Sequence, residues 1–294
     1  MWVGSLFRHH ISRAKRIAQN KPPYDGNFWV SEKHKLIYLS IPKNANSYFK
    51  SLFLYNHPVA FDYVPELETA NEYLSRTAKK GELTATSATI LRDKGYTKFV
   101  ILRDPLARLV SAYLDKVVNS ARMSRHDERR GKAYHSDGFF NEISQTLGVK
   151  VDRDTLSFSQ LLRYLEKTSP FLVDKHYRAQ WIFLNRIPFD YYGTMENIPD
   201  VLDFLKSRGL RTHSFTARSP KRTPYTKPLP SGSNRNIADM PASDLRLCDR
   251  YPPAQEFFKQ PATLERAAKL YKSDISIFLK VQALDKEAYF KRYR

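Results

Sequence analysis

Two short polar turns in the sequence each place one cation directly after an apolar run. The first turn, residues 42–47, contains Lys43, and the second begins at Arg103. Lysine and arginine side chains bind phosphate and sulfate well, and arginine can do so with two parallel hydrogen bonds. Ser111 follows Arg103 by about two helical turns and adds a hydroxyl donor. These residue types predict two neighbouring sites for phosphate or sulfate groups.

The segments around both turns predict the strands and helices that position them. The apolar runs 36–41 and 96–102 predict buried strands, and helical spacing follows each turn, at 48–53 and 106–118. Two strand–turn–helix units in succession predict an α/β fold with a parallel sheet and helices on its faces. Because the carboxyl ends of parallel strands share one edge, we expect both turns there, beside the N–H groups of a helix N-terminus.

Composition and charge limit the class of partner. The chain has 294 residues, of which 41% are hydrophobic, so an α/β domain with insertions can bury a sizeable core. The formal net charge of +19 implies an anionic partner: a nucleotide, a polyanionic glycan, a nucleic acid or an acidic membrane surface. No nucleic-acid-binding motif is present, which disfavours a nucleic acid. The single cysteine, Cys248, excludes a disulfide framework and fits a reducing compartment, so we expect a cytoplasmic protein.

The chain is expected to form a single domain over residues 1–294, with three distinct segments. Residues 1–20 predict a basic amphipathic helix that either packs on its own domain or contacts a membrane peripherally. Neither a membrane-spanning segment nor a secretory signal is expected. Residues 119–138 predict an exposed charged insertion, and 213–244 a long loop or lid. Further helices are expected at 139–147, at 158–167 with a serine cap, at 197–207 with a stop at Gly209, and at 264–281, and a short strand at 189–192.

Two common nucleotide-binding signatures are absent. The Walker pattern G-x-x-x-x-G-K-[ST] does not occur around Lys43, and the chain contains no G-x-G-x-x-G. An ordinary P-loop kinase and a Rossmann dehydrogenase are therefore disfavoured.

Five segments together resemble a known family. IPKNANSYFK (41–50) is similar to the 5′-phosphosulfate loop, and RDPLARLVSAYLDK (103–116) to the 3′-phosphate motif, of sulfotransferases that use 3′-phosphoadenosine 5′-phosphosulfate (PAPS). Looser matches to the carbohydrate, or family 2-like, branch follow in the same order: DKHYRAQ (174–180), FDYYGTMENIPDVLDFL (189–205) and LYKSDISIF (270–278). The paired cysteines of secreted eukaryotic members are missing, so the chain resembles a bacterial member.

This resemblance implies a P-loop-like three-layer fold in which a central parallel sheet is flanked by helices. It implies PAPS as the sulfate donor, with no metal. Lys43 would act catalytically on the bridging and leaving-group oxygens, while Arg103 and Ser111 would hold the 3′-phosphate. The residues implied to bind the 5′-phosphosulfate are Lys43, Asn44, Ala45, Asn46, Ser47 and Tyr48.

An acceptor hydroxyl needs a base near neutral pH. His176, in the third matched segment, is the leading candidate, and Glu196 is the alternative. The competing interpretations are a structural or surface histidine and a carboxylate paired with an arginine. Arg178 and Trp181 are the predicted acceptor-binding residues, although Arg178 can instead pair with Glu196, and Trp181 can belong to the core.

The predicted reaction is in-line transfer of a sulfuryl group to a hydroxyl or amine of a carbohydrate. The basic runs 122–132 and 218–227 fit an anionic glycan as acceptor. Two alternatives stay open at this point: a small-molecule metabolite as acceptor, and a non-catalytic basic protein that binds nucleotides or polyanions. The sequence leaves the oligomeric state undetermined.

Overall fold

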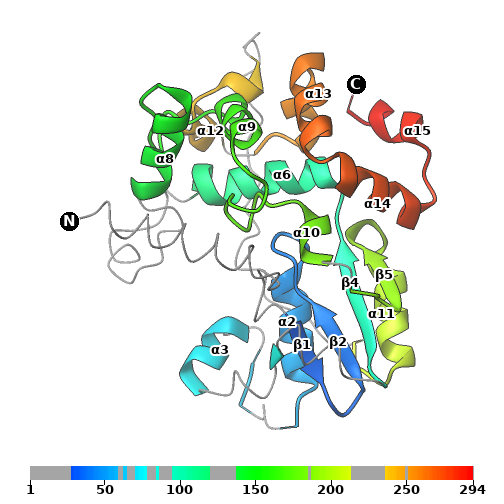
Figure 1. Ribbon diagram of the computed structural model, residues 1–294. Helices are drawn as coiled ribbons and strands as arrows, with labels where there is room; N and C mark the ends of the chain where they lie inside the picture. The colour runs from blue at the N-terminus through cyan, green and yellow to red at the C-terminus, as the bar shows by residue number, and fades with distance from the viewer. Residues whose placement is uncertain are drawn as a thin grey trace. The chain divides into compact units, whose positions relative to one another are not determined.

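The structure is a computed structural model that describes residues 28–58, 62–64, 70–77, 84–85, 95–119, 137–184, 187–212, 236–248 and 251–293 (Figure 1). The predicted helix at 1–20, residues 120–136 of the charged insertion, residues 213–235 of the loop and both basic runs lie outside these residues. The described chain forms two compact units. The sheet unit comprises the described residues within 28–104 and 180–212, and the helical unit those within 105–179 and 236–293. The prediction of a single domain stays a prediction.

The sheet unit contains a five-stranded sheet in the order β3-β1-β2-β4-β5. Its strands are β1 (Phe28–Ser31), β2 (Leu36–Leu39), β3 (Thr84–Ala85), β4 (Thr97–Leu102) and β5 (Tyr191–Thr194). The pairs β2–β4 and β4–β5 are parallel, whereas β1 pairs antiparallel with both β2 and β3. The α/β class is confirmed, and the sheet is parallel over β2, β4 and β5. The carboxyl ends of these three strands therefore share one edge.

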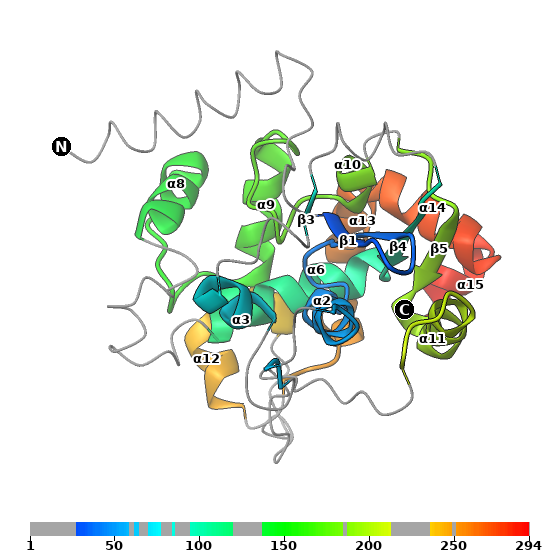
Figure 2. The ribbon, with the colours of Figure 1, turned by 90° about the horizontal axis from the view of Figure 1, so that it is seen from below.

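Helices cover this sheet because their apolar faces match its buried side chains. The helical elements of the sheet unit are α2 (Asn46–Tyr55), α3 (Ala70–Thr77), α10 (Gln180–Leu184), the 3-10 turn η3 (Met195–Asn197) and α11 (Ile198–Ser207). Figure 2 shows α2 and α11 on one face of the sheet. On that face Tyr38 stacks on Phe99 at a centroid distance of 5.2 Å, and Phe53 packs beside them. Gly193 lets α11 approach, because a Cβ there would lie 2.5 Å from Cγ2 of Val201.

The helical unit is built from α-helices and short helical turns. These are α6 (Pro105–Tyr113), the π-helical turn η1 (Leu114–Val118), α8 (Asp137–Leu147), α9 (Phe158–Lys167), η4 (Ile237–Asp239), α12 (Ala242–Leu247), η5 (Ala254–Phe258), α13 (Pro261–Leu270), α14 (Lys272–Gln282) and α15 (Lys286–Lys291). Tyr113, Phe158 and Phe257 form edge-to-face contacts in its core. Within the described residues, none of the helices has the length and apolarity that a membrane crossing requires.

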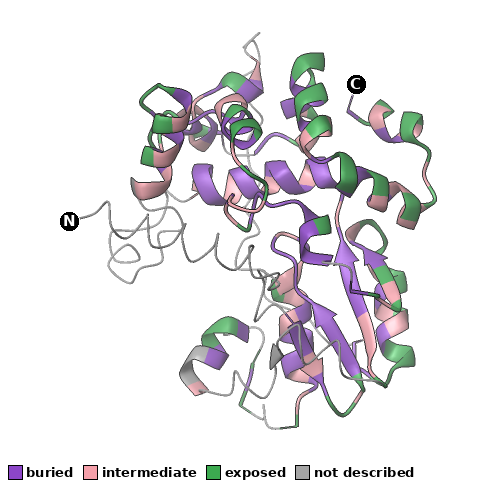
Figure 3. Ribbon diagram, in the orientation of Figure 1, coloured by how far each residue is buried: buried purple, intermediate pink, exposed green. Residues whose placement is uncertain are grey.

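Most predicted elements are confirmed, and their burial explains why. Figure 3 shows β2 entirely buried, as its continuous apolar run predicts. Ser157 caps α9 through a reciprocal pair of hydrogen bonds with Gln160, and Gly209 follows α11 with a φ of 85°.

Three features differ from the prediction. The helix expected at 264–281 is two helices, α13 and α14, with a break at Tyr271, whose hydroxyl donates to the carbonyl of Tyr177. Residues 237–239 and 242–244 of the predicted loop form η4 and the start of α12. The antiparallel strands β1 and β3 were not predicted, because only four and two residues, respectively, pair in them.

Candidate active site

The first basic turn adopts a backbone conformation that is costly for its residues. Lys43 has a φ of 73° and Ala45 a φ of 51°, although neither is a glycine. A residue with a Cβ loses about 1 kcal/mol in the left-handed region, and such outliers gather at ligand-binding turns. Ala45 then begins α2 without a side-chain cap, and the first turn of α2 carries no acidic residue. This helix N-terminus is therefore suited to an anion.

The Asn44 side chain fixes the first turn to the neighbouring strand. It is fully buried, and its Nδ2 donates to the carbonyl of Ile101 at 2.8 Å and to Oε1 of Gln180 at 2.6 Å. Asn44 was predicted as part of the 5′-phosphosulfate cradle. In the structure its side chain points inward, so that only its backbone is suited to that part.

The second basic turn is bonded directly to the first. Nη1 of Arg103 donates to the carbonyl of Lys43 at 3.0 Å. Gln180, which is 2% exposed, joins both turns: its Oε1 accepts the N–H of Arg103 at 3.1 Å and its Nε2 donates to the carbonyl of Arg103 at 2.8 Å. The same Oε1 accepts from Asn44, so one buried amide sets the spacing of the two turns.

Sequence reasoning missed this role of Gln180. The motif 174–180 ends on this residue, but a glutamine at the start of a short helix has no characteristic spacing that marks it as a clamp. The only available signal was the position of Gln180, which follows both basic turns in the sequence and ends a segment that matches the family.

The third parallel strand contributes Glu196, in the η3 turn that follows β5. Its Oε1 accepts the backbone N–H of Asp104 at 3.1 Å, so it supports the turn that holds Arg103. Partial burial of the carboxylate raises the pKa of Glu196 above its ordinary value, although the residue as a whole is exposed. A raised pKa moves a carboxylate toward the range of a general base.

The remaining predicted residues of the sheet unit lie on helical first turns. Asn46 and Ser47 open α2, where Ser47 is exposed and Asn46 half-buried. Tyr48 is half-buried against Phe49, and burial raises the pKa of the Tyr48 hydroxyl. Trp181 is the second residue of α10 and is 36% exposed, which suits a surface for stacking.

Three predicted site residues belong to the helical unit instead. Ser111 is half-buried on α6. His176 is 5% exposed, and its Nδ1 lies 2.6 Å from Oδ1 of Asp174. Burial lowers the pKa of His176 to about 4, against the raising effect of Asp174, so the imidazole is neutral at pH 7. The part of His176 as a base stays a prediction.

Arg178 is turned into the helical unit. It is 2% exposed, and its Nη2 donates to the carbonyls of Phe171 at 3.1 Å and Val173 at 2.9 Å. Its own carbonyl accepts from Nη1 of Arg108 at 2.8 Å. These contacts hold the chain of residues 171–178 in place. Acceptor binding by Arg178 stays a prediction.

The model of the sulfotransferase family matches residues 26–280, which include both basic turns and Glu196. The chain belongs to the sulfotransferase family. The match covers most of the sequence, including the sheet and its strand-end turns.

Curated relatives of this sulfotransferase chain carry a narrower name. Human carbohydrate sulfotransferase 9 is 26% identical over 175 residues, which is 58% of this chain and 38% of the relative. Zebrafish (Danio rerio) carbohydrate sulfotransferase 10 is 27% identical over 51% of this chain and 40% of its own length. Human carbohydrate sulfotransferase 8 is 21% identical over 88% of this chain and 55% of its own.

These alignments limit what carries over to the sulfotransferase chain. The aligned part spans 38% to 55% of the three relatives, so each of them has a large portion without a counterpart in the match. No solved structure matches the chain at a significant level.

Proposed function

We propose that the protein transfers a sulfuryl group from PAPS to a hydroxyl or amine of a carbohydrate acceptor. The family match supports sulfuryl transfer, and the names of the relatives support a carbohydrate. The resemblance and the geometry of the strand-end turns support the donor and the residue roles.

One observation carries the proposal: Gln180 holds two cation-bearing turns at a fixed spacing. Its amide bonds to Asn44 in the first turn and to Arg103 in the second, and Arg103 reaches the carbonyl of Lys43. PAPS carries anionic groups at two positions of its ribose, the 3′-phosphate and the 5′-phosphosulfate. A ligand of that kind needs two anion sites at a set distance, and a rigid spacing lowers the entropic cost of binding both.

Lys43 is assigned to the reacting end of the donor. In the transfer, the bond between sulfur and the bridging oxygen breaks while a bond forms from sulfur to the acceptor oxygen or nitrogen. Negative charge grows on the bridging oxygen as 3′-phosphoadenosine 5′-phosphate leaves, and the Lys43 ammonium would stabilise it. Backbone N–H groups of residues 44–47, with the Ser47 hydroxyl, would hold the 5′-phosphate.

The acceptor proton passes to a base during the transfer. Glu196 lies at the strand-end edge of the sheet unit, where partial burial raises the pKa of its carboxylate. His176 is neutral at pH 7 because burial lowers its pKa to about 4, which also weakens it as a base. Because burial raises the pKa of Glu196 and lowers that of His176, Glu196 is the better suited of the two predicted bases at neutral pH.

The proposal is tested by incubating the chain with labelled donor and a panel of oligosaccharides, small alcohols and amines, followed by mass spectrometry. We expect sulfate on a saccharide; label found only on small molecules would contradict the carbohydrate acceptor. Calorimetry with 3′-phosphoadenosine 5′-phosphate tests the donor site separately.

Arg103→Ala should weaken nucleotide binding by about 100-fold, because a charge-assisted phosphate contact is lost. Arg208→Ala is the matched control, since Arg208 is an exposed arginine at the end of α11 in the same unit. Equal nucleotide affinity in both variants would remove Arg103 from the 3′-phosphate site.

A further inference from the structure

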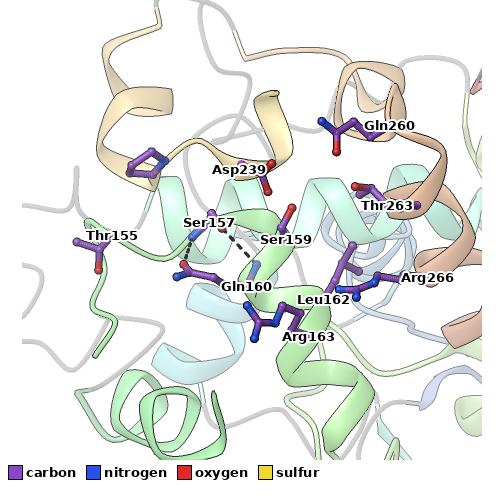
Figure 4. Close-up of a pocket in the computed structure, with 12 residues that line it drawn as sticks. Thr155, Ser157, Ser159, Gln160, Leu162, Arg163, Asp239, Gln260, Thr263 and Arg266 are labelled. Atoms are coloured by element: carbon purple, nitrogen blue, oxygen red, sulfur yellow. Dashed lines mark hydrogen bonds between the residues drawn. The ribbon is translucent and has the colours of Figure 1, made fainter. Parts of the chain in front are cut away.

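A polar groove lies within the helical unit, formed by elements that the proposed chemistry does not use. It has a volume of about 730 Å³ and is lined by the N-terminal halves of α9 and α13, by η4 and by Pro241. Figure 4 shows side chains from these three elements facing a common space. The groove therefore belongs to one compact unit.

Uncharged polar groups face this groove. The hydroxyls of Ser159 and Thr263 and the amide of Gln260 point into it, and none makes a side-chain hydrogen bond within the described residues (Figure 4). Thr263 is only 7% exposed. Ser159 is half-buried and Gln260 is exposed, so the three groups are available to form hydrogen bonds with a ligand in the groove.

Two exposed arginines line the groove. Arg163 is the sixth residue of α9 and Arg266 the sixth residue of α13. Arg266 has weak compensation from Glu166, at 3.8 Å, whereas the exposed Arg163 has no ion-pair partner within the described residues. Gln260, the N-cap residue of α13, makes no capping hydrogen bond. The two guanidinium groups thus favour an anion.

The opposite end of the groove carries a carboxylate. Oδ2 of Asp239 accepts from Nδ2 of Asn236 at 2.6 Å, and the group also lines the groove. A carboxylate accepts hydrogen bonds from hydroxyl groups but repels an anion. A ligand with hydroxyl donors at one end and a negative charge at the other would therefore match both ends of the groove.

We propose that this groove binds an acidic saccharide, with its sulfate or carboxylate at Arg163 and Arg266 and its hydroxyls at Asp239, Ser159 and Thr263. The choice of a saccharide over another hydroxylated anion rests on the proposed function. The anion preference rests on the groove itself.

The test is calorimetry of the full chain, saturated with 3′-phosphoadenosine 5′-phosphate, against a sulfated hexasaccharide and a neutral hexasaccharide. Saturation with the nucleotide keeps the strand-end site filled. We expect measurable binding of the sulfated probe only. The double variant Arg163→Gln/Arg266→Gln should weaken it by at least about tenfold, because two charge-assisted contacts are lost.

A matched control removes the same charge elsewhere. Lys269→Gln/Lys272→Gln alters two exposed lysines on α13 and α14 that do not line the groove, and its affinity should stay within about twofold. If both double variants lose affinity for the sulfated probe equally, or if neither does, the proposal that the groove binds an acidic saccharide is wrong. Thr263→Val, which keeps the side-chain shape, should weaken the probe by about fivefold through its lost hydroxyl.

Hydrogen exchange provides the second readout. The sulfated probe should slow exchange of the amides at 158–163 and 262–266, and protection confined to other segments would contradict the proposal. Failure of sulfate transfer in the unaltered chain would contradict the proposed function alone, since probe binding in the groove is measured without turnover.

Discussion

Arg103 and Arg178 both lie in segments that resemble motifs of the family, yet the two side chains make different kinds of contact in the structure. Arg103 is half-buried in the strand-end turns of the sheet unit, where it bonds to the carbonyl of the neighbouring Lys43 turn. Arg178 is 2% exposed in the helical unit and bonds to two carbonyls of its own segment, at Phe171 and Val173.

The two regions show that a residue of a matched motif can serve either ligand binding or the stability of the fold. In the strand-end turns, positive φ values, an uncapped helix and half-exposed cations coincide, and these features suit a binding surface. In the segment 171–178, the guanidinium group of Arg178 is turned inward and satisfies backbone carbonyls. A matched motif residue therefore predicts importance, while its burial and its partners decide between ligand binding and architecture.

The largest expected effect comes from Lys43. Lys43→Ala should lower kcat for sulfate transfer by about 10³-fold, because the charge that stabilises the leaving group is lost. Thermal unfolding should change little. Lys33→Ala, an exposed lysine in the turn after β1, is the control and should retain full activity. A Lys43 variant that keeps its turnover would place catalysis elsewhere.

Arg178 tests the other side of the comparison. Arg178→Met keeps the aliphatic stem but leaves the carbonyls of Phe171 and Val173 without their donor, so the chain should lose about 3 kcal/mol of stability. Urea unfolding measures this loss. The folded fraction should bind 3′-phosphoadenosine 5′-phosphate normally. If stability is unchanged while KM for the acceptor rises, Arg178 binds substrate and the architectural interpretation is wrong.

Gln180 has no charge, so its effect on the nucleotide site should be smaller. Gln180→Leu should weaken binding of 3′-phosphoadenosine 5′-phosphate by about 30-fold, because the amide no longer joins the two turns. Adenosine 5′-phosphate engages one turn only, and its affinity should fall by less than about threefold. Gln180→Glu keeps the acceptor oxygen and should lie between. Equal losses for both nucleotides would show a general defect rather than a lost spacing.

His176 gives the smallest effect, and it depends on pH. Burial lowers the pKa of His176 to about 4 from an ordinary value of 6.5, so below pH 6.5 the unfolded chain takes up a proton that the folded chain does not. Stability should therefore fall as the pH decreases from 6.5 toward 4, by about 2 kcal/mol at pH 5. His176→Asn should flatten this part of the curve in urea unfolding at pH 7, 6 and 5. An unchanged slope would mean that another group titrates there.

The sequence predicted the strand-end turns well because their signals are local. Apolar runs bounded by polar residues located β2 and β4, and helical spacing located α2 and α6. The clamp by Gln180 escaped prediction because its partners lie 136 and 77 residues away along the chain. The inward turn of Arg178 escaped for another reason: a charged residue type suggests solvent, and only the tertiary fold supplies the carbonyls that bury it.

The backbone of the first turn has a consequence for how rigid the site is before a ligand binds. Lys43 and Ala45 hold positive φ angles without glycine. Glycine would reach these angles easily, but it would leave many other conformations open to the turn. With side chains at both positions, the turn has fewer alternatives once the chain has folded, so most of its conformational entropy is lost before any ligand arrives. Binding of the anion then needs less free energy to order the turn, so the turn is preorganised for its ligand.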